Sequence, residues 1–281
     1  MGLLLLLGAL QACTGGIKLG YNNGVDLAAW WLDGHVDLNK PQSQQVRSDL
    51  RQLQAEHRQK MLPEYAQTLR QTQALVVNDL TAEQVCAVGT TIRGYADALL
   101  LVAEPAATTL AISLTPAQIG NLERKYVKTD ADYRKDWLNL GPADMHEKRF
   151  DKALERAEMV YGRLDATQKT LLRQQVDQSS FEPQRVHAER LRRQTDIIKT
   201  LREIDRTSSS SADARATVAA LLKRAVHSPD TAHRQYADAL AHEDCRAIAA
   251  VHNSTSEKQR AAAVKWLGGY AQTFMELSAQ H

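Results

Sequence analysis

The chain has 281 residues and a formal net charge of +2, from 35 Lys and Arg against 33 Asp and Glu. This balance excludes a generally basic nucleic-acid-binding protein and an acidic tail protein. Glycine (14 residues), proline (7 residues) and aromatic residues (5%) are all scarce, which argues against a sandwich, a barrel or a collagen-like fold and favours helices.

The first thirteen residues have the pattern of a secretory signal. Leu3 to Leu7 form an unbroken leucine run. About eight apolar residues cover roughly 12 Å of helix, far less than the ~30 Å hydrocarbon core of a bilayer. The run is therefore too short to span a membrane, but it suits the apolar region of a signal peptide. Because no Lys or Arg precedes it, we expect the translated chain to start upstream of Met1.

The segment Leu10-Gln11-Ala12-Cys13 resembles the lipobox of bacterial lipoproteins. The resemblance implies that residues 1–12 are a signal peptide removed after Ala12, and that Cys13 carries diacylglycerol. Thr14 rather than Asp follows Cys13, which in Gram-negative lipoproteins usually means export to the outer membrane. We therefore expect an outer-membrane lipid anchor with the body facing the periplasm. Residues 13–24, rich in Gly and Asn, would form the lipidated cysteine and a flexible tether.

Four expected helix starts share one chemistry, in which an N-cap residue stands three positions before a glutamine. The cap side chain accepts a hydrogen bond from the amide of the glutamine, whose side chain reaches back to the amide of the cap. These capping boxes are Thr81 with Gln84, Thr115 with Gln118, Asp165 with Gln168, and Ser256 with Gln259.

The caps and the apolar spacing predict an all-α fold, an elongated bundle of about nine or ten helices that forms one domain over residues 25–281. Pro63 should bend or interrupt the second helix. Breaks are expected at residues 104–113 and at the serine run 207–211, where the domain could divide. The expected helices are 25–38, 41–78, 82–103, 116–138, 143–162, 166–179, 183–206, 212–227, 230–252 and 257–278.

Two of the capping boxes resemble a known motif. The segments Leu80 to Gln84 and Leu114 to Gln118 match the LTxxQ motif of the Spy/CpxP family of periplasmic chaperones, and Leu164 to Gln168 is a looser copy. The four caps are 34, 50 and 91 residues apart, so their spacing does not separate an internal repeat from unrelated helices that share good caps.

Most of the chain, from Leu3 to the C-terminus, also looks like an uncharacterised family of Gram-negative lipoproteins. This resemblance implies a membrane-anchored, α-helical body and no assigned activity. The segments that carry it are the lipobox, residues 17–23, 31–33, 36–38, 57–58 and 62–65, and the stretch 149–168.

Cys86 and Cys245 remain in the mature chain. In an oxidising compartment they either form a disulfide, worth about 3–5 kcal/mol in the chain-entropy model, or are two buried small residues. His242, Cys245 and His252 share one helix face, but about 10 Å of helix separates Cys245 from His252, too far for one metal ion. We therefore expect a solvated or core face there, with no metal site and no cofactor.

Residues 183–206 carry two rows of charge at seven-residue spacing. We expect them to pair on a solvated face; the alternative is a docking face for a partner helix or for anionic lipid headgroups. The basic row is Arg185, Arg192, Lys199 and Arg206, and the acidic row is Glu182, Glu189, Asp196 and Glu203.

Two tryptophans, Trp30 and Trp31, follow the expected tether. Their size favours a role as anchors of the core. The alternative is a position at the membrane interface, which is favoured by their nearness to the lipid anchor.

The sequence contains no Walker-type loop, dinucleotide-binding glycine motif, nucleophile elbow or HExxH motif. Glu56, His57, Arg58 and Glu64 could act as acid and base groups, but the sequence gives them no substrate pocket. We therefore expect no catalytic residue and a non-enzymatic binding or chaperone-like role in the cell envelope. Its partners would be the membrane, through Cys13, and unfolded or envelope proteins, without nucleic acid. The alternatives are a structural or assembly partner docking through the charged helix face and, more remotely, a hydrolase-type enzyme.

Overall fold

The structure is a computed structural model that describes residues 16–207 and 211–280. This part of the chain is 87% helical and contains no strand, so the expected all-α fold is confirmed. Its elements are α2 (Gly24–Val36), α3 (Lys40–Glu56), the π-helical segment η1 (His57–Met61), α4 (Leu62–Leu75), α5 (Ala82–Ser113), α6 (Pro116–Tyr133), the π-helical segment η2 (Arg134–Leu138), α7 (Pro142–Tyr161), α8 (Ala166–Asp177), α9 (Pro183–Thr207), α10 (Ser211–Val226), α11 (Thr231–Asn253) and α12 (Glu257–Ser278).

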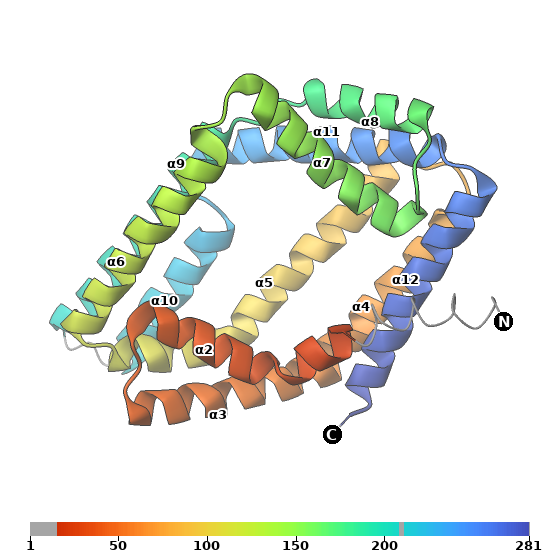
Figure 1. Cartoon of the computed structure of the whole chain (residues 1–281). Coiled ribbons are helices and arrows are strands. Elements are labelled where there is room, and N and C mark those ends of the chain that lie inside the picture. Colours follow the sequence, from red (N-terminus) through yellow and green to blue (C-terminus); the bar gives the residue numbers. More distant parts are fainter. Residues whose placement is uncertain (1–15, 208–210, 281) are drawn as a thin grey trace.

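The helices form an elongated bundle arranged as a four-sided frame (Figure 1). One side holds α2 and α3, the next α6 and α9, the third α7, α8 and α11, and the fourth α4 and α12. The longest helix, α5, runs between two opposite corners of this frame, and α10 packs beside it. The buried side chains form three separate clusters instead of one central core.

Pro63 and Pro105 have different effects on the helices that contain them. Just before Pro63 the α-helical pattern of backbone hydrogen bonds changes to that of the π-helical η1, where the Leu62 amide bonds to the His57 carbonyl. The expected interruption is therefore confirmed. The break predicted at residues 104–113 is wrong, because α5 continues through Pro105 to Ser113. Packing explains this difference: Ala107, Leu110 and Ala111 lie in the first apolar cluster, which offsets the one backbone hydrogen bond that proline removes.

The flexible tether predicted over residues 13–24 is wrong for residues 16–22, which are helical. This helix is held to the body by side chains. The Tyr21 hydroxyl bonds to His57 Nδ1 at 2.8 Å, Arg58 donates to the Asn22 side chain at 2.7 Å, and Lys18 forms an ion pair with Glu276. These contacts outweigh the low helix propensity of Gly and Asn. The serine positions 208–210 of the predicted break lie outside the described residues.

All four predicted capping boxes are present, and a fifth was missed. At the start of α3 the Asn39 side chain accepts from the Gln42 amide, and the Gln42 side chain accepts from the Asn39 amide. The segment Leu38-Asn39-Lys40-Pro41-Gln42 has the same form as the others, with Asn in place of Thr as the cap. Admitting Asn, which is as good an N-cap residue as Ser or Thr, would have identified it.

The glutamines of two capping boxes bind one another. Gln42 Nε2 donates to Gln118 Oε1 at 3.0 Å, and Gln118 Nε2 donates to Gln42 Oε1 at 2.7 Å. The second Nε2 hydrogens bond to the carbonyls of Ser113 (2.6 Å) and Asp37 (2.8 Å), each two residues before the N-cap of the partner glutamine. Both side chains are buried, and every donor and acceptor of the two amides is used. We call this pair the first glutamine clasp.

A second glutamine clasp joins Gln168 and Gln259 in the same way. Their amides exchange hydrogen bonds of 2.8 and 2.9 Å. Gln168 also donates to the Ser254 carbonyl and Gln259 to the Arg163 carbonyl, again two residues before the cap of the partner. The helices around the clasps correspond as well, since α2, α3, α5 and α6 pack with one another as α7, α8, α11 and α12 do. The two corners are therefore an internal structural repeat, which the spacing of the caps did not reveal.

The turn before each clasp also repeats. Asp37 and Gly162, which end α2 and α7, are the two described residues with positive φ, at 61° and 74°. In both turns an acidic side chain of the preceding helix accepts the amide of the leucine before the cap: Asp33 for Leu38 at 2.9 Å and Glu158 for Leu164 at 3.1 Å. The residue with positive φ and this acid together reverse the chain so that the clasp can form.

The start of α5 is fastened to the second corner. Asn253 accepts from the Leu80 amide at 2.8 Å and donates to the Leu80 carbonyl at 3.0 Å. Beside it, the fully buried His252 donates from Nε2 to the Asn78 carbonyl at 2.8 Å, so its Nδ1 accepts from the Tyr161 hydroxyl at 3.0 Å. Since the end of α5 bonds to Gln42 through Ser113, α5 connects the two clasps.

We predict that the clasps couple their glutamines energetically. Gln118→Leu should lower the free energy of unfolding by about 1–3 kcal/mol, because it strands a buried amide. Gln84 also closes a capping box, but it has no glutamine partner. Gln84→Leu should therefore lower the free energy of unfolding by less than about 1 kcal/mol. In urea titrations, the double variant Gln42→Leu/Gln118→Leu should lose less than the two single variants added together. Strict additivity would contradict the clasp.

We predict that His252 makes the protein less stable as the pH falls. Burial lowers the pKa of its imidazole, so the folded chain resists a proton that the unfolded chain accepts below about pH 6.5. Stability should be retained above that pH and decrease below it. Between pH 7 and pH 5, the free energy of unfolding measured in urea should fall less steeply with pH for His252→Gln than for the parent chain. His242→Gln changes an exposed histidine and is the control. Some slope should remain, because burial also lowers the pKa of His57. Equal slopes would contradict this role.

Candidate functional site

The most unusual surface of the described residues is one face of α5, where a row of uncharged side chains is exposed. At 100° per residue these positions fall within about 80° of one another. We call this row the α5 stripe; it consists of Ala87, Thr91, Gly94, Ala98, Leu101, Pro105, Thr109 and Ile112. At 1.5 Å per residue it is about 37 Å long. Most of its side chains are small, and its two large apolar side chains face solvent: Leu101 is 78% exposed and Ile112 is 45% exposed.

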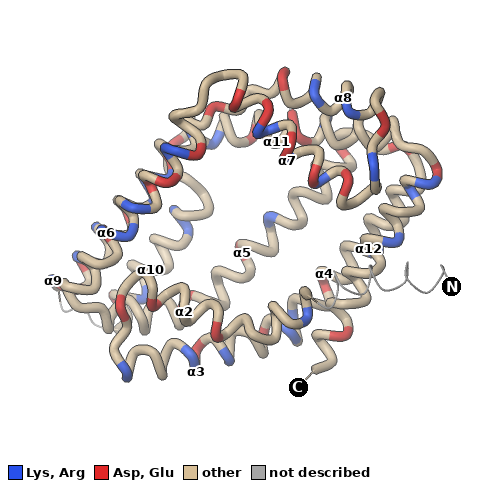
Figure 2. Tube along the Cα trace, in the orientation of Figure 1, with Lys and Arg blue, Asp and Glu red and all other residues tan. Residues whose placement is uncertain are grey.

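The α5 helix carries little charge along its length (Figure 2). Its most apolar 18-residue stretch has a mean hydropathy of 1.4, and none of that stretch is buried. By length and composition alone, α5 could cross a membrane, but the same property is found in helices of soluble proteins. Here α5 packs against α3, α9, α10 and α11, which makes it part of the helical body.

The other faces of α5 are fixed by covalent and ionic contacts. Cys86 forms a disulfide with Cys245 of α11, 159 residues away and with a Cα–Cα distance of 5.4 Å. Of the two alternatives left by the sequence, the structure therefore contains the disulfide. Further along, the buried Glu104 pairs with Arg215 of α10 at 2.9 Å. The stripe is thus the free side of a helix that is fastened at both ends and along its length.

The histidines and the cysteine of α11 do not form a metal site. The sulfur of Cys245 is used in the disulfide, and His242 Nδ1 lies 3.5 Å from the Cys86 sulfur. Both ring nitrogens of His252 are hydrogen-bonded within the protein. Among the residues that the structure describes, no group of three or more His, Cys, Asp or Glu side chains is placed to hold a metal ion.

The acid and base groups near η1 are engaged in packing and pairing. His57 Nδ1 bonds to Tyr21, and its ring lies against Tyr65 with the ring centres 5.4 Å apart. Glu56 pairs with Lys60 at 2.6 Å. The bond to Tyr21 attaches the helix of residues 16–22 to the body, and none of these contacts pairs His57 with a carboxylate.

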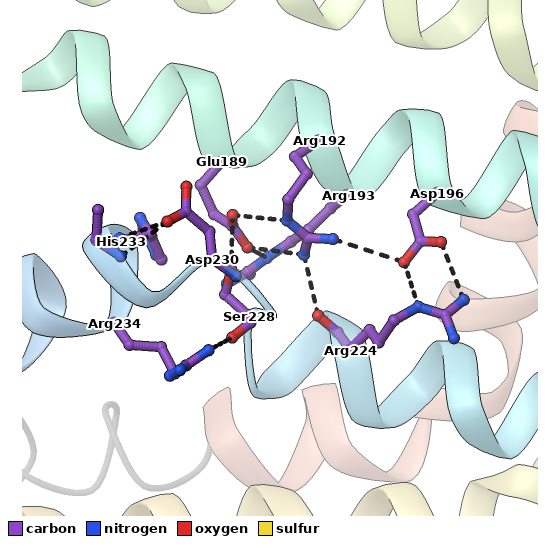
Figure 3. Close-up of polar contacts among 10 residues, drawn as sticks. Glu189, Arg192, Arg193, Asp196, Arg224, Ser228, Asp230, His233 and Arg234 are labelled. Atoms are coloured by element: carbon purple, nitrogen blue, oxygen red, sulfur yellow. Dashed lines mark hydrogen bonds and ion pairs between the residues drawn. The ribbon is translucent and has the colours of Figure 1, made fainter.

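The charged rows of α9 pair with each other as predicted, but the face is solvated only towards its ends, because its middle is covered. Glu189 is buried and accepts from Arg192, Arg193 and Ser228, which together lower the pKa of its carboxyl to about 2 despite burial (Figure 3). Asp196 pairs with Arg224 of α10 at 2.9 Å. The pattern of charges could not show that this face lies against α10. The charged side chains in the middle of the alternative docking face are therefore already paired within the chain.

The prediction that Trp30 and Trp31 anchor the core is wrong. Their exposed fractions are 72% and 56%, and the buried positions of α2 are Ala29 and Val36 instead. The predicted lipid-attachment residue Cys13 and the predicted cleavage residue Ala12 lie outside the described residues.

Comparison with known proteins identifies a family without an assigned activity. No curated protein and no solved structure matches the chain. The model of the family of unknown function DUF6279 matches residues 34–225, from the end of α2 to the end of α10. This range is more than half of the chain and includes Gln42, Gln118 and Gln168 of the two clasps. The chain therefore belongs to the DUF6279 family.

Proposed function

We propose that this protein is a membrane-anchored lipoprotein of the cell envelope with a non-enzymatic, chaperone-like binding role. The observation that carries the proposal is the α5 stripe, an uncharged surface exposed along about 37 Å of a fixed helix. Soluble proteins rarely leave long apolar surfaces exposed without a binding partner. An apolar segment of an unfolded client could lie along this stripe and bury Leu101.

The chemistry of the stripe favours low selectivity. Its small side chains present a smooth surface, and its hydroxyls already bond within the helix, as Thr91 does to the Ala87 carbonyl at 3.2 Å. Binding through apolar contact alone is non-directional and depends little on the amino-acid sequence of a client. The similarity of Leu80 to Gln84 and Leu114 to Gln118 to the LTxxQ motif of the Spy/CpxP chaperones supports the same role.

The proposed anchor rests on the N-terminal sequence. The leucine run and the segment Leu10 to Cys13 have the form of a lipoprotein signal, with cleavage after Ala12 and acylation of Cys13. Two or more acyl chains hold a protein firmly at a bilayer, since each buried methylene contributes about 0.8 kcal/mol. Such an anchor in the outer membrane would keep the α5 stripe close to proteins crossing the periplasm.

We predict that the purified chain slows the aggregation of an unfolded client at near-stoichiometric amounts, and that Ala98→Glu/Leu101→Glu removes most of this effect. The added charges prevent apolar contact along the stripe while leaving an exposed helix surface folded. Light scattering measures the rate. Val127→Glu is the matched control, because Val127 is 71% exposed on α6, away from the stripe. Absence of an effect on several clients would contradict the role, and equal loss in both variants would contradict the stripe.

We predict that Cys13→Ser releases the protein from the membrane, because the thioether that carries the acyl chains can no longer form. Fractionation of cells expressing each form should move the variant from the membrane pellet towards the soluble fraction. Cys86→Ser is the control and should stay in the pellet. A Cys13→Ser protein that fractionates with membranes as fully as the parent chain, after cleavage of the leader, would contradict the lipid anchor.

A further inference from the structure

One face of α2 is apolar, exposed and close to the N-terminus. Leu27, Trp30, Trp31 and Gly34 follow the i, i+3, i+4, i+7 spacing of one helix face, and all four are exposed. Two large aromatic side chains here are unusual, because the chain has only four tryptophans. We call these four residues the α2 face.

The charges of α2 point away from this face. Asp26 forms an ion pair with Arg47 of α3, and Asp33 accepts the Leu38 amide at 2.9 Å. Both acids lie about 100° around the helix from the centre of the α2 face. His35 bonds to the Trp31 carbonyl at 2.7 Å and packs its ring against Trp31, with the ring centres 4.0 Å apart. The exposed surface therefore consists of two indoles and a leucine, without a charge that water must solvate.

The position of the α2 face in the chain identifies what covers it. Fifteen residues precede the first described residue, and they include the leucine run and Cys13. From Cys13 to Gly16 the chain spans at most about 11 Å, and the helical path from Gly16 to Trp30 adds about 21 Å. A lipid at Cys13 would therefore keep the α2 face within about 32 Å of the bilayer, and next to it when α2 lies parallel to the membrane. Leu19, which is also exposed, lies between the two.

We propose that the α2 face lies on the phospholipid bilayer, with Trp30 and Trp31 at the level of the headgroups. Tryptophan is enriched at that depth, because its ring is apolar and its N–H can bond to water or to lipid oxygens. This inference rests on the proposed lipid anchor, and it adds a fixed orientation to that anchor.

The test is tryptophan quenching by brominated lipid. The full chain, purified from membranes, is reconstituted into phosphatidylethanolamine and phosphatidylglycerol vesicles containing phosphatidylcholine brominated on its acyl chains. One variant, Trp137→Phe/Trp266→Phe, reports Trp30 and Trp31. The matched control, Trp30→Phe/Trp31→Phe/Trp266→Phe, reports Trp137 of η2, between α6 and α7. We expect the emission of Trp30 and Trp31 to fall about twofold, as for indoles at the bilayer interface, and that of Trp137 to stay unchanged.

Mass spectrometry of the N-terminal peptide separates failure of this inference from failure of the anchor. An acylated chain whose Trp30 and Trp31 are quenched no more than Trp137 would overturn the α2 contact and leave the anchor in place. If Cys13 carries no lipid, the anchor fails, and quenching by added vesicles then tests the α2 face alone. Sedimentation tests whether a second copy of the chain covers the α2 face instead. If the parent chain is a dimer and Trp30→Lys/Trp31→Lys is a monomer, the face belongs to a dimer interface and the contact with lipid is overturned.

Discussion

The structure depends on the two glutamine clasps. In each, two helix N-termini meet, and one pair of side-chain amides caps both helices, joins them, and bonds to the carbonyls of the turns that precede them. An amide can do this because it has two donors and two acceptor sites, and a clasp uses all of them. A carboxylate lacks the donors, so Glu in place of Gln118 would cap its own helix but could not complete the exchange.

The clasps explain why so much apolar surface remains exposed. Because α5 connects the two corners and α11 holds it through the Cys86–Cys245 disulfide, its position does not require every face to be buried. The three apolar clusters lie around the first clasp, around the second, and between α4 and α12, and none of them covers the middle of α5. The α5 stripe, from Ala87 to Ile112, therefore stays exposed because the frame holds α5 in place without covering this face.

Local features could be predicted from the sequence, and pairings between distant segments could not. The capping boxes follow from residues three apart, so Thr115 and Gln118 could be placed without the fold. Nothing local indicates that Gln42 binds Gln118, 76 residues away. Residue type also misled where burial was inferred from it: Trp30 is exposed and Glu189 is buried. The α5 stripe was missed, although its uncharged side chains repeat at helical spacing, because the expected break at residues 104–113 divided it.

Photocrosslinking in intact cells tests most directly whether the frame holds α5 open for binding. A photoreactive amino acid replaces Leu101 on the stripe in one variant and Val127 on α6 in another; both side chains are more than two-thirds exposed. The account predicts adducts with several envelope proteins from position 101 and few from position 127. Equal yields at the two positions, or no adduct at position 101, would contradict it.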